Sequence, residues 1–552
     1  MLGVLISTPS ARAQPVIGTG GVLNAASYAL PGLANSDIAQ GSMFVVFGQR
    51  LGPSALQLPQ SFPLPAQLAG TSIRVTGGGV TADAVMVYTS AAQVAAILPS
   101  RIPPGDASIT VTYNNQASAP ARIRVARSSL GIFTRNQGGS GPGIVQDYVS
   151  VAEQPMNGLT EVAHPSQVMI LWGTGLGPVD FDETQPPQVK NLDVDLEVLV
   201  AGKSAQVLYK GRSPQFPGID QINFQLPPDV PLGCYVPVVV RAGGVVSNFV
   251  TISVADSGHV CSDPKSFSAA DMETARSTGS LRMVSINLSK LIVLNGSPGT
   301  YDEGSNNSRR WDLETMLRRT RIGSYAPPYG ACTVVASAVG SGDPLNLTEN
   351  PGPGWAVSID ANTTLNLNGP LGARHWLNDN SAGLGGGIPG YTDSFGPEYL
   401  VPGVYTVDNG NGSSNIGAYR ATLTLPAPIA WTNQSSVSAI TRSQDVTVTW
   451  AGGDDSREFV MIGGLSSDTN LGVGALFACT ERPSAGRFTV PRLVLSSLPP
   501  SGTMNLGGQL VPSGYLQVVT ISMTEPNRFH AQGLDTGIIS YTLNTVKVLS
   551  YQ

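Results

Sequence analysis

The sequence FVVFGQRLGP at residues 44–53 recurs as MILWGTGLGP at residues 169–178, an offset of 125 positions. Glycine permits positive φ and close backbone approach, and proline fixes φ where the chain leaves a corner. We therefore interpret each copy as a buried strand followed by a tight corner, with Leu176 as a core plug under the second bend. The motif positions are Gly48, Gly52 and Pro53 in the first copy and Gly173, Gly175, Gly177 and Pro178 in the second.

The repeat continues beyond the corner. Further matches occur at offsets of 128 and 129: Gln93 with Gln221, Pro99 with Pro227, and Ser118 with Ser247. The drift of a few residues is what small loop changes between two copies of one fold would produce. A unit of about 125 residues thus occurs twice, and repeats of this kind indicate duplicated domains.

Polar and apolar residues alternate in the segments between these motifs, as in SIRVT at 72–76 and DVDLEV at 193–198. Alternation at period two is typical of half-buried strands, and strand candidates recur at the spacing of β-sandwiches. We predict an all-β protein with tandem immunoglobulin-like sandwich domains, followed by further β-rich, sandwich-like units.

The second unit resembles a known family. The residues that carry the resemblance are GIFT at 131–134, WGTGLGP at 172–178, GIDQIN at 218–223 with Pro227, and Gly243-Gly244 through Asn248. They resemble the Solibacter-type uncharacterized C-terminal domain of secreted acidobacterial proteins. The first unit, with GVLNAASY at 21–28, is similar to the domain that precedes it there. The resemblance implies IPT/TIG-like, immunoglobulin-like folds and a secreted protein, and it implies no activity. In this chain nearly 300 residues follow the matching domain, unlike the family pattern.

We divide the chain as follows: a signal peptide remnant at 1–13, immunoglobulin-like domains at 14–128 and 129–256, a linker at 257–329, and β-rich domains at 330–430 and 431–552. In the linker we expect a strand pair over 282–294. We also expect a short helix that is capped by Ser308, covers 311–319 and stops at Gly323.

The N-terminus and the cysteines both bear on cellular location. Residues 1–7 are mostly apolar, and Ala11-Arg12-Ala13 has the small-x-small form that precedes signal-peptide cleavage. We therefore expect a secreted, cell-surface or periplasmic protein, in which disulfides are favoured. Four cysteines allow three pairings. We favour Cys234 with Cys261 and Cys332 with Cys479; the alternative is four buried thiols.

Composition excludes several classes of protein. Only 12% of residues are charged, and the formal net charge is −6, so the basic surface of a nucleic-acid-binding protein is not expected. Coiled coils and helical bundles are excluded by the low charge and the high glycine and proline content. No apolar stretch reaches the roughly 18 residues of a membrane span.

No catalytic or cofactor motif stands out. A nucleophile elbow and a P-loop are absent, and the four histidines are far apart in sequence. Asp193, Asp195 and Glu197 share one strand face and could hold Ca²⁺, but such a row is more often a solvated strand face. Trp172 and Trp450 are predicted to be core residues, although exposed aromatic rings on a sandwich can also stack on sugars.

These observations favour a non-catalytic secreted or cell-surface protein for adhesion, binding or display. We expect it to recognise an extracellular protein or a glycan through its immunoglobulin-like domains, without a cofactor. The alternative is a secreted carbohydrate-active enzyme, or its accessory carbohydrate-binding region, with the active part in residues 330–552.

Overall fold

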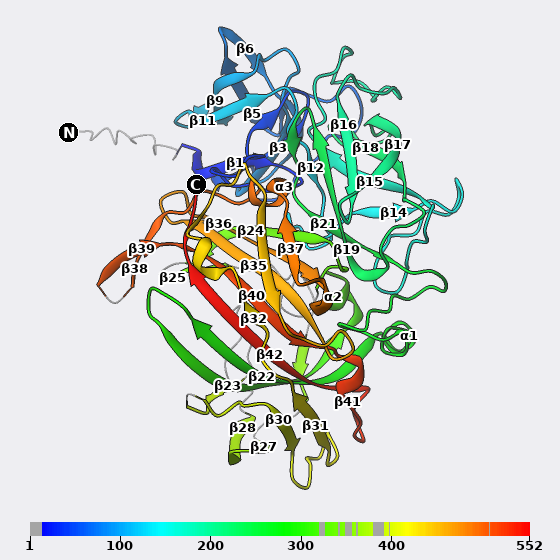
Figure 1. Ribbon diagram of the computed structural model, residues 1–552. Helices are drawn as coiled ribbons and strands as arrows, with labels where there is room; N and C mark the ends of the chain where they lie inside the picture. The colour runs from blue at the N-terminus through cyan, green and yellow to red at the C-terminus, as the bar shows by residue number, and fades with distance from the viewer. Residues whose placement is uncertain are drawn as a thin grey trace, which may run out of the picture.

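The computed structural model describes residues 14–318, 326–340, 343–347, 356–359, 363–378, 391–396, 398–506 and 508–552. About 51% of the protein is strand and 6% is helix, so the predicted all-β class is confirmed. Figure 1 shows two domains at one end of the molecule and a third, larger body at the other. The expected signal peptide remnant at 1–13 lies outside the described residues.

The first domain is a sandwich of two sheets. Apolar side chains from both sheets, including Phe44, Ile73 and Val111, meet in one core. Alternate residues of each strand point into this core because successive side chains leave a strand on opposite sides. One sheet contains, in order, β1 (Val16–Asn24), β3 (Met43–Gln49), β8 (Gln93–Ile97) and β7 (Val85–Thr89). The other contains β2 (Ile38–Ala39), β11 (Ala121–Ala126), β9 (Gly105–Tyr113), β5 (Thr71–Gly77) and β4 (Gln67–Leu68); in addition, β10 (Gln116–Ala117) pairs with β9 and β6 (Val80–Asp83) pairs with β5.

The second domain repeats this arrangement, except that the long β17 joins the two halves of the sandwich into one sheet. Leu171, Phe224 and Val240 belong to its core. The order is β12 (Gly131–Ile132), β15 (Val168–Thr174), β18 (Asp220–Gln225), β17 (Lys203–Arg212), β16 (Leu196–Val200), β19 (Gly233–Ala242), β21 (Val250–Val254) and β13 (Gly141–Pro142). In addition, β14 (Val145–Asp147) pairs with β15, and β20 (Val245–Val246) pairs with β19.

The two glycine motifs occupy equivalent positions. Phe47 on β3 pairs with Gln93 on β8, and Trp172 on β15 pairs with Gln221 on β18, so the register is the same in both domains. Leu176 is fully buried under its corner, as expected of a plug.

A second shared detail lies at the closing hairpins. The Val111 N–H donates to Ser118 Oγ at 3.1 Å in the first domain, and the Val240 N–H donates to Ser247 Oγ at 3.0 Å in the second. The same local geometry at corresponding places confirms that one fold occurs twice.

A buried ion pair fixes the glycine corner of the second domain to the first. Asp220 accepts the backbone N–H of Gly175 at 2.7 Å and pairs with the guanidinium of Arg212. Arg212 also donates to the carbonyl oxygens of Gly41 in the first domain and Gly177 in the second, both at 2.7 Å. Gly175 and Gly177 adopt φ of +116° and +142°, which favours glycine at both positions.

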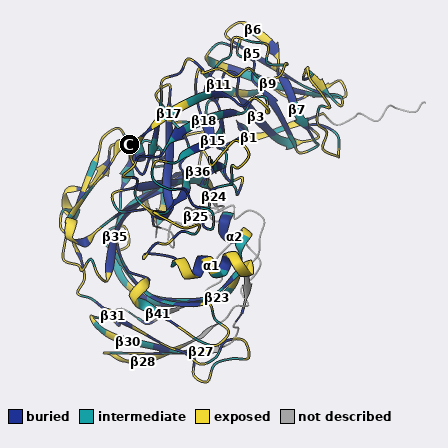
Figure 2. Cartoon of the chain, turned by 90° about the vertical axis from the view of Figure 1, so that its right-hand side faces the viewer, coloured by how far each residue is buried: buried dark blue, intermediate teal, exposed yellow. Residues whose placement is uncertain are grey.

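The third body is built on an 11-stranded sheet of the described residues. Its order is β25 (Asp343–Leu347), β24 (Cys332–Gly340), β36 (Val473–Glu481), β35 (Glu458–Asp468), β40 (Gly514–Ser522), β42 (Thr536–Val548), β22 (Ser280–Val293), β23 (Gly299–Asp312) and β26 (Ala356–Ser358). The short β29 (Tyr391–Ser394) and β41 (Arg528–Phe529) pair with β23 and β42. Figure 2 shows this sheet strongly curved, with helix α1 (Ala269–Thr278) inside the curve.

Smaller sheets cover one face of the large sheet. At one end, Ile286 and Tyr541 pack on Tyr405 of a sheet with the order β28 (Gly372–Asn378), β27 (Thr363–Gly369), β30 (Gly403–Asp408) and β31 (Arg420–Leu425). At the other end, Ile462 packs with Trp450 of the sheet β32 (Ala430–Trp431), β34 (Val446–Ala451) and β37 (Arg487–Val490). Two short pairs complete the body: β33 (Ala439–Ile440) with β43 (Ser550–Tyr551), and β38 (Thr503–Leu506) with β39 (Gln509–Pro512).

The structure differs here from the expected division into a linker at 257–329 and domains at 330–430 and 431–552. The strand pair of the expected linker is longer than predicted and lies within the large sheet, where β22 pairs in parallel with β42. Likewise β24 pairs with β36, across the expected boundary near residue 430. These pairings join segments far apart in sequence, so one interleaved body replaces a linker and two separate units.

The expected helix at 311–319 is also shifted. Residues up to Asp312 continue β23, in which buried and less buried side chains alternate at period two. Helix α2 (Leu313–Arg318) follows, and Asp312, not Ser308, accepts a backbone N–H of its first turn, from Thr315 at 2.7 Å. The expected stop at Gly323 lies outside the described residues.

Both favoured disulfides are present. Cys234 on β19 is bonded to Cys261, and Cys332 on β24 is bonded to Cys479, directly opposite on β36. The first ties the segment after the second domain back onto that domain. The second locks the pairing of two strands that are 147 residues apart.

Candidate functional site

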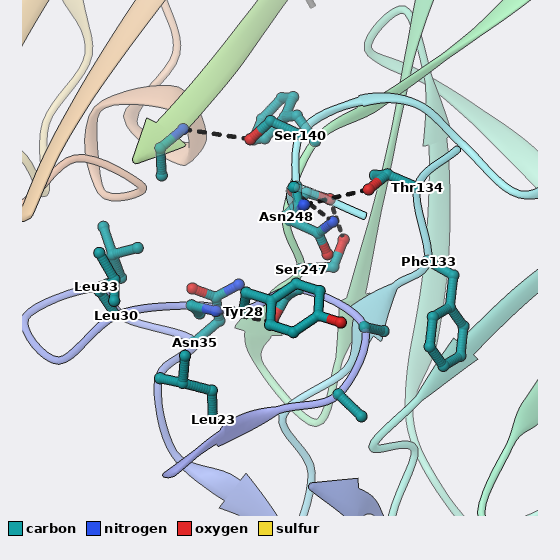
Figure 3. A pocket seen from close by; sticks show the side chains of 18 of the residues that line it. Leu23, Tyr28, Leu30, Leu33, Asn35, Phe133, Thr134, Ser140, Ser247 and Asn248 are labelled. Carbon is teal, nitrogen blue, oxygen red and sulfur yellow. Dashed lines mark hydrogen bonds between the residues drawn. The ribbon is translucent and has the colours of Figure 1, made fainter. Parts of the chain in front are cut away.

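A cavity of about 950 Å³ lies where the first and second domains meet the large sheet. Figure 3 shows Leu23, Tyr28 and Leu33 of the first domain with Phe133, Thr134 and Asn248 of the second. The loop that follows β1 provides much of one wall, and β24 together with the end of α3 (Arg492–Leu495) provides another. The site is therefore built from three parts of the chain.

Three aromatic rings line the first-domain wall. Tyr28 and Phe47 lie with their ring centroids 6.1 Å apart, and Gln93 Nε2 donates to the hydroxyl of Tyr88 at 2.7 Å. Burial and, to a smaller extent, the nearby Tyr28 raise the pKa of Tyr88 to about 12 although the hydrogen bond with Gln93 lowers it, so this phenol is neutral at physiological pH. The rings are half-buried, which leaves part of their surface facing the cavity.

Tyr28 is held in an uncommon backbone conformation, with φ of 49°. Such a conformation costs free energy for a residue with a side chain, and it persists where surrounding contacts impose it. Asn24 provides those contacts, because its side-chain oxygen accepts the N–H groups of Ala26 (2.9 Å) and Ser27 (3.1 Å) and its carbonyl accepts that of Tyr28 (3.1 Å). The turn therefore presents Tyr28 to the cavity at a local cost.

The second-domain wall is polar and pre-ordered. Asn248 Nδ2 donates to the carbonyl oxygens of Ile132 (2.9 Å) and Gly139 (2.8 Å). Gly139 in turn donates its N–H to Thr134 Oγ1 at 3.1 Å. At Gly139, φ is +76° and an added Cβ would lie only 1.9 Å from the carbonyl oxygen of Ser27, so the domains can approach this closely only with glycine.

The large sheet closes the third side. Val334, Ala336, Ser337 and Ala338 of β24 line the cavity there, and the N–H of Ala336 donates to Ser140 Oγ of the second domain at 3.3 Å. Gln137 and Ala338 are exposed, which places the opening of the cavity between the second domain and β24.

The cavity has an uncharged lining. None of its described lining residues is Asp, Glu, His, Lys or Arg; the polar groups are amides and hydroxyls. Such groups donate and accept hydrogen bonds but do not ionise near neutral pH. The arrangement is suited to hold a neutral ligand by ring contact and hydrogen bonding, and it offers no general acid or base.

Carboxyl groups with a raised pKa lie elsewhere. Burial raises the pKa of Asp147 on β14 to about 7, although a hydrogen bond from Asn157 lowers it. Burial likewise raises the pKa of Glu458 on β35 to about 7, although a hydrogen bond from the Asp454 N–H lowers it. Neither residue lines the cavity.

The candidate calcium residues do not converge. Asp193 and Asp195 are exposed, and Asp193 faces Arg127 with 3.6 Å between Oδ2 and Nη2. Glu197 pairs with Arg241 at 2.7 Å. In the described part of the chain no group of three or more His, Cys, Asp or Glu side chains is placed to hold a metal ion.

The other motif residues lie outside the cavity lining and contribute to strand packing and turns within the two domains. Gly48 lies where a Cβ would meet the carbonyl oxygen of Val16 on the neighbouring strand, 2.1 Å away, and Gly52 lies against Thr89. Pro227 begins the turn after β18, where its carbonyl accepts the N–H of Val230 at 3.1 Å. Gln221 lies half-buried on the outer face of β18.

The predicted burial of the two tryptophans is confirmed for only one of them. Trp450 is buried, as predicted, but Trp172 is half-buried and is not among the core side chains of its domain. Tyr28, Phe47 and Tyr88 are site residues that the sequence does not predict. Phe47 and Tyr28 do lie within quoted motifs, but no local pattern tells that separate domains bring them to one cavity.

No family model matches the chain, and no curated protein matches it. Within the described residues, no helix combines the length and apolarity that a membrane crossing requires.

Solved structures give distant likenesses. The chain is similar to SGBP-B from a complex xyloglucan utilization locus in Bacteroides uniformis, at 9% identity over 88% of each chain with a TM-score of 0.15. It is similar to the FN1–FN3 domains of chicken CNTN1, at 10% identity over 72% of this chain and 93% of that chain, with a TM-score of 0.13. It is also similar to immunoglobulin domains 1–4 of Sidekick-1, at 11% identity over 94% and 97% of the chains, with a TM-score of 0.11. At these scores the likenesses carry no argument about function.

Proposed function

We propose that this is a secreted or cell-surface, non-catalytic binding protein that holds a neutral saccharide in the cavity between its domains. The observation that carries the proposal is the cavity wall itself, in which Tyr28, Phe47 and Tyr88 stand beside Gln93 and no described lining residue is charged. Two disulfides favour an oxidising, extracytoplasmic location.

The chemistry of a saccharide fits this wall. A sugar ring has apolar C–H faces, which pack on aromatic rings, and a rim of hydroxyls, which need both donors and acceptors. Amide side chains supply both, and Gln93 is the amide of the aromatic wall, whereas the amide of Asn248 is bonded to the backbone of Ile132 and Gly139. A site with buried aromatic surface and a few placed polar groups is the usual form of a small-ligand pocket.

The same lining argues for binding without turnover. Glycoside hydrolysis uses two carboxyl groups about 5–10 Å apart across the scissile bond. The described cavity lining supplies none. An enzyme with its active part in residues 330–552 is the competing proposal, and the experiment below separates the two.

The test is a glycan array probed with the full disulfide-bonded chain, beside the variants Phe47→Ala and Tyr301→Ala. Tyr301 is an exposed tyrosine on β23 and serves as the matched control. We expect binding to neutral glycans that Phe47→Ala weakens about tenfold or more and Tyr301→Ala leaves unchanged. Binding to charged glycans alone, binding to proteins alone, or product formation from the glycan would each overturn the proposal.

A further inference from the structure

The aromatic wall of the first domain has a counterpart in the second. Phe47 and Trp172 occupy equivalent positions on β3 and β15, and each pairs with a glutamine, Gln93 or Gln221. The register shift on the next strand is also repeated: it falls between Met86 and Tyr88 in β7, and between Val207 and Tyr209 in β17.

The repeated register shift brings a tyrosine to the same face. A bulge of this kind re-aims the side chain that follows it. Tyr88 pairs with Ala95 on β8, and Tyr209 pairs with Asn223 on β18. Each domain thus carries an aromatic ring, a glutamine and a tyrosine side by side on the outer face of three equivalent strands. These strands are β3, β8 and β7 in the first domain and β15, β18 and β17 in the second.

The second-domain set is held in place by hydrogen bonds. The Trp172 indole N–H donates to Gln146 Oε1 at 2.7 Å, and Gln221 Nε2 donates to Asn223 Oδ1 at 2.9 Å. Tyr209 folds back over Gly211, where an added Cβ would lie 2.5 Å from the tyrosine hydroxyl oxygen. Because Gly211 is the ladder partner of Gln221, this ring lies beside the glutamine.

These side chains do not serve the core of the domain. The buried residues of β18 are Asp220, Ile222 and Phe224, whereas Gln221 and Asn223 alternate with them on the opposite face. Trp172 and Tyr209 are half-buried there, and all members of the set are uncharged. Tryptophan and tyrosine are enriched at binding surfaces because each combines a large apolar ring with a polar group that can form a hydrogen bond.

We propose that the outer face of β15, β18 and β17 is a second saccharide-binding site, in which Trp172 stacks on a sugar ring and Gln221 and Asn223 bind its hydroxyls. This inference rests on the proposed function, because the first domain's copy of the same set lines the cavity. The saccharide is favoured over a charged ligand because the set offers rings and amides and no ion. The chain would then be bivalent toward one class of glycan, which raises avidity for a polymer that spans both sites.

The experiment is isothermal titration of the full chain with a neutral oligosaccharide chosen from the array, together with tryptophan fluorescence. The variants are Trp172→Ala, Phe47→Ala and the double variant, with Trp172→Phe as the conservative change that keeps a ring. We expect two saccharides per chain, one lost in each single variant and both in the double. The fluorescence change on binding shrinks in Trp172→Phe, although the sugar still binds.

The outcomes separate the two proposals. One saccharide per chain that is lost in Phe47→Ala and kept in Trp172→Ala overturns the second site and leaves the cavity site standing. One saccharide that is lost only in Trp172→Ala overturns the cavity site and supports the second. If no neutral glycan binds, both are overturned. Should Trp172→Ala fail to fold, Gln221→Leu takes its place, and unchanged affinity in that variant overturns the second site.

Discussion

The side-chain amide of Asn24 in the first domain donates a 3.0 Å hydrogen bond to the backbone carbonyl of Thr174 in the second. A second bond from the same nitrogen reaches the carbonyl of Ser129 at 3.2 Å. Asn24 is fully buried and also holds the turn that presents Tyr28. One side chain therefore links the junction of the two domains to the geometry of the cavity wall.

We predict that Asn24→Ala destabilises the junction and weakens ligand binding together. Buried backbone groups that lose their partner cost about 1–3 kcal/mol each, so the free energy of unfolding falls by at least that amount. Differential scanning calorimetry should show a lower unfolding temperature for Asn24→Ala. Isothermal titration should show a reduced affinity of this variant for the saccharide. The exposed Asn470→Ala is the control. An Asn24→Ala protein with unchanged stability would contradict the account of the junction.

The buried ion pair of Arg212 and Asp220 gives a second prediction. Arg212→Met leaves the Asp220 carboxylate buried without its cation, which costs about 3–5 kcal/mol of unfolding free energy. The exposed ion pair of Arg241 and Glu197 serves as the control. We expect Arg241→Met to lower the free energy of unfolding by less than about 1 kcal/mol. Urea denaturation measures both, and equal effects would show that the buried pair does not hold the domains together.

The pH dependence of stability follows from Asp147 and Glu458, whose pKa values burial raises to about 7. Between about pH 4 and pH 7 the folded state keeps protons that the unfolded chain releases. The free energy of unfolding therefore decreases as the pH rises through this window and levels off above it.

Asp147→Asn removes part of this decrease, because the amide stays neutral at every pH. Urea titrations at pH 5 and pH 8 should differ by less in Asp147→Asn than in the unaltered protein, with the exposed Asp195→Asn as control. The same difference in all three proteins would mean that Asp147 is ionised in the folded state.

The disulfides differ in what they contribute. The Cys332–Cys479 bond closes a segment of 147 residues and the Cys234–Cys261 bond one of 27. Loop-closure entropy predicts about 5 and about 3.5 kcal/mol respectively. The paired alanine variants of Cys332 and Cys479 should unfold at a lower temperature than those of Cys234 and Cys261. The reverse order would show that native packing, rather than chain entropy, sets the difference.

The sequence predicted the tandem domains because their signals are local. The glycine corners predict turns, and the polar–apolar alternation predicts strands. Each signal lies within a few residues of the turn or strand that it predicts, as do the matched Gln93 and Gln221. The third body could not be predicted in this way. Its β22 pairs with β42, some 250 positions later, and the same alternating pattern would fit a separate hairpin equally well. Trp172 was assigned to the core because a tryptophan ending an apolar strand usually is buried, and the polar neighbours that reveal its exposed side come from β14 and β18.

Hydrogen–deuterium exchange can locate a saccharide bound in the cavity between the domains. The full chain is compared with and without a saturating neutral oligosaccharide from the array. If the sugar binds there, we expect slower amide exchange at residues 23–35, 133–140 and 244–249. Protection confined to parts of residues 330–552 other than the cavity-lining segments 334–338 and 496–497, or none at all, would contradict it.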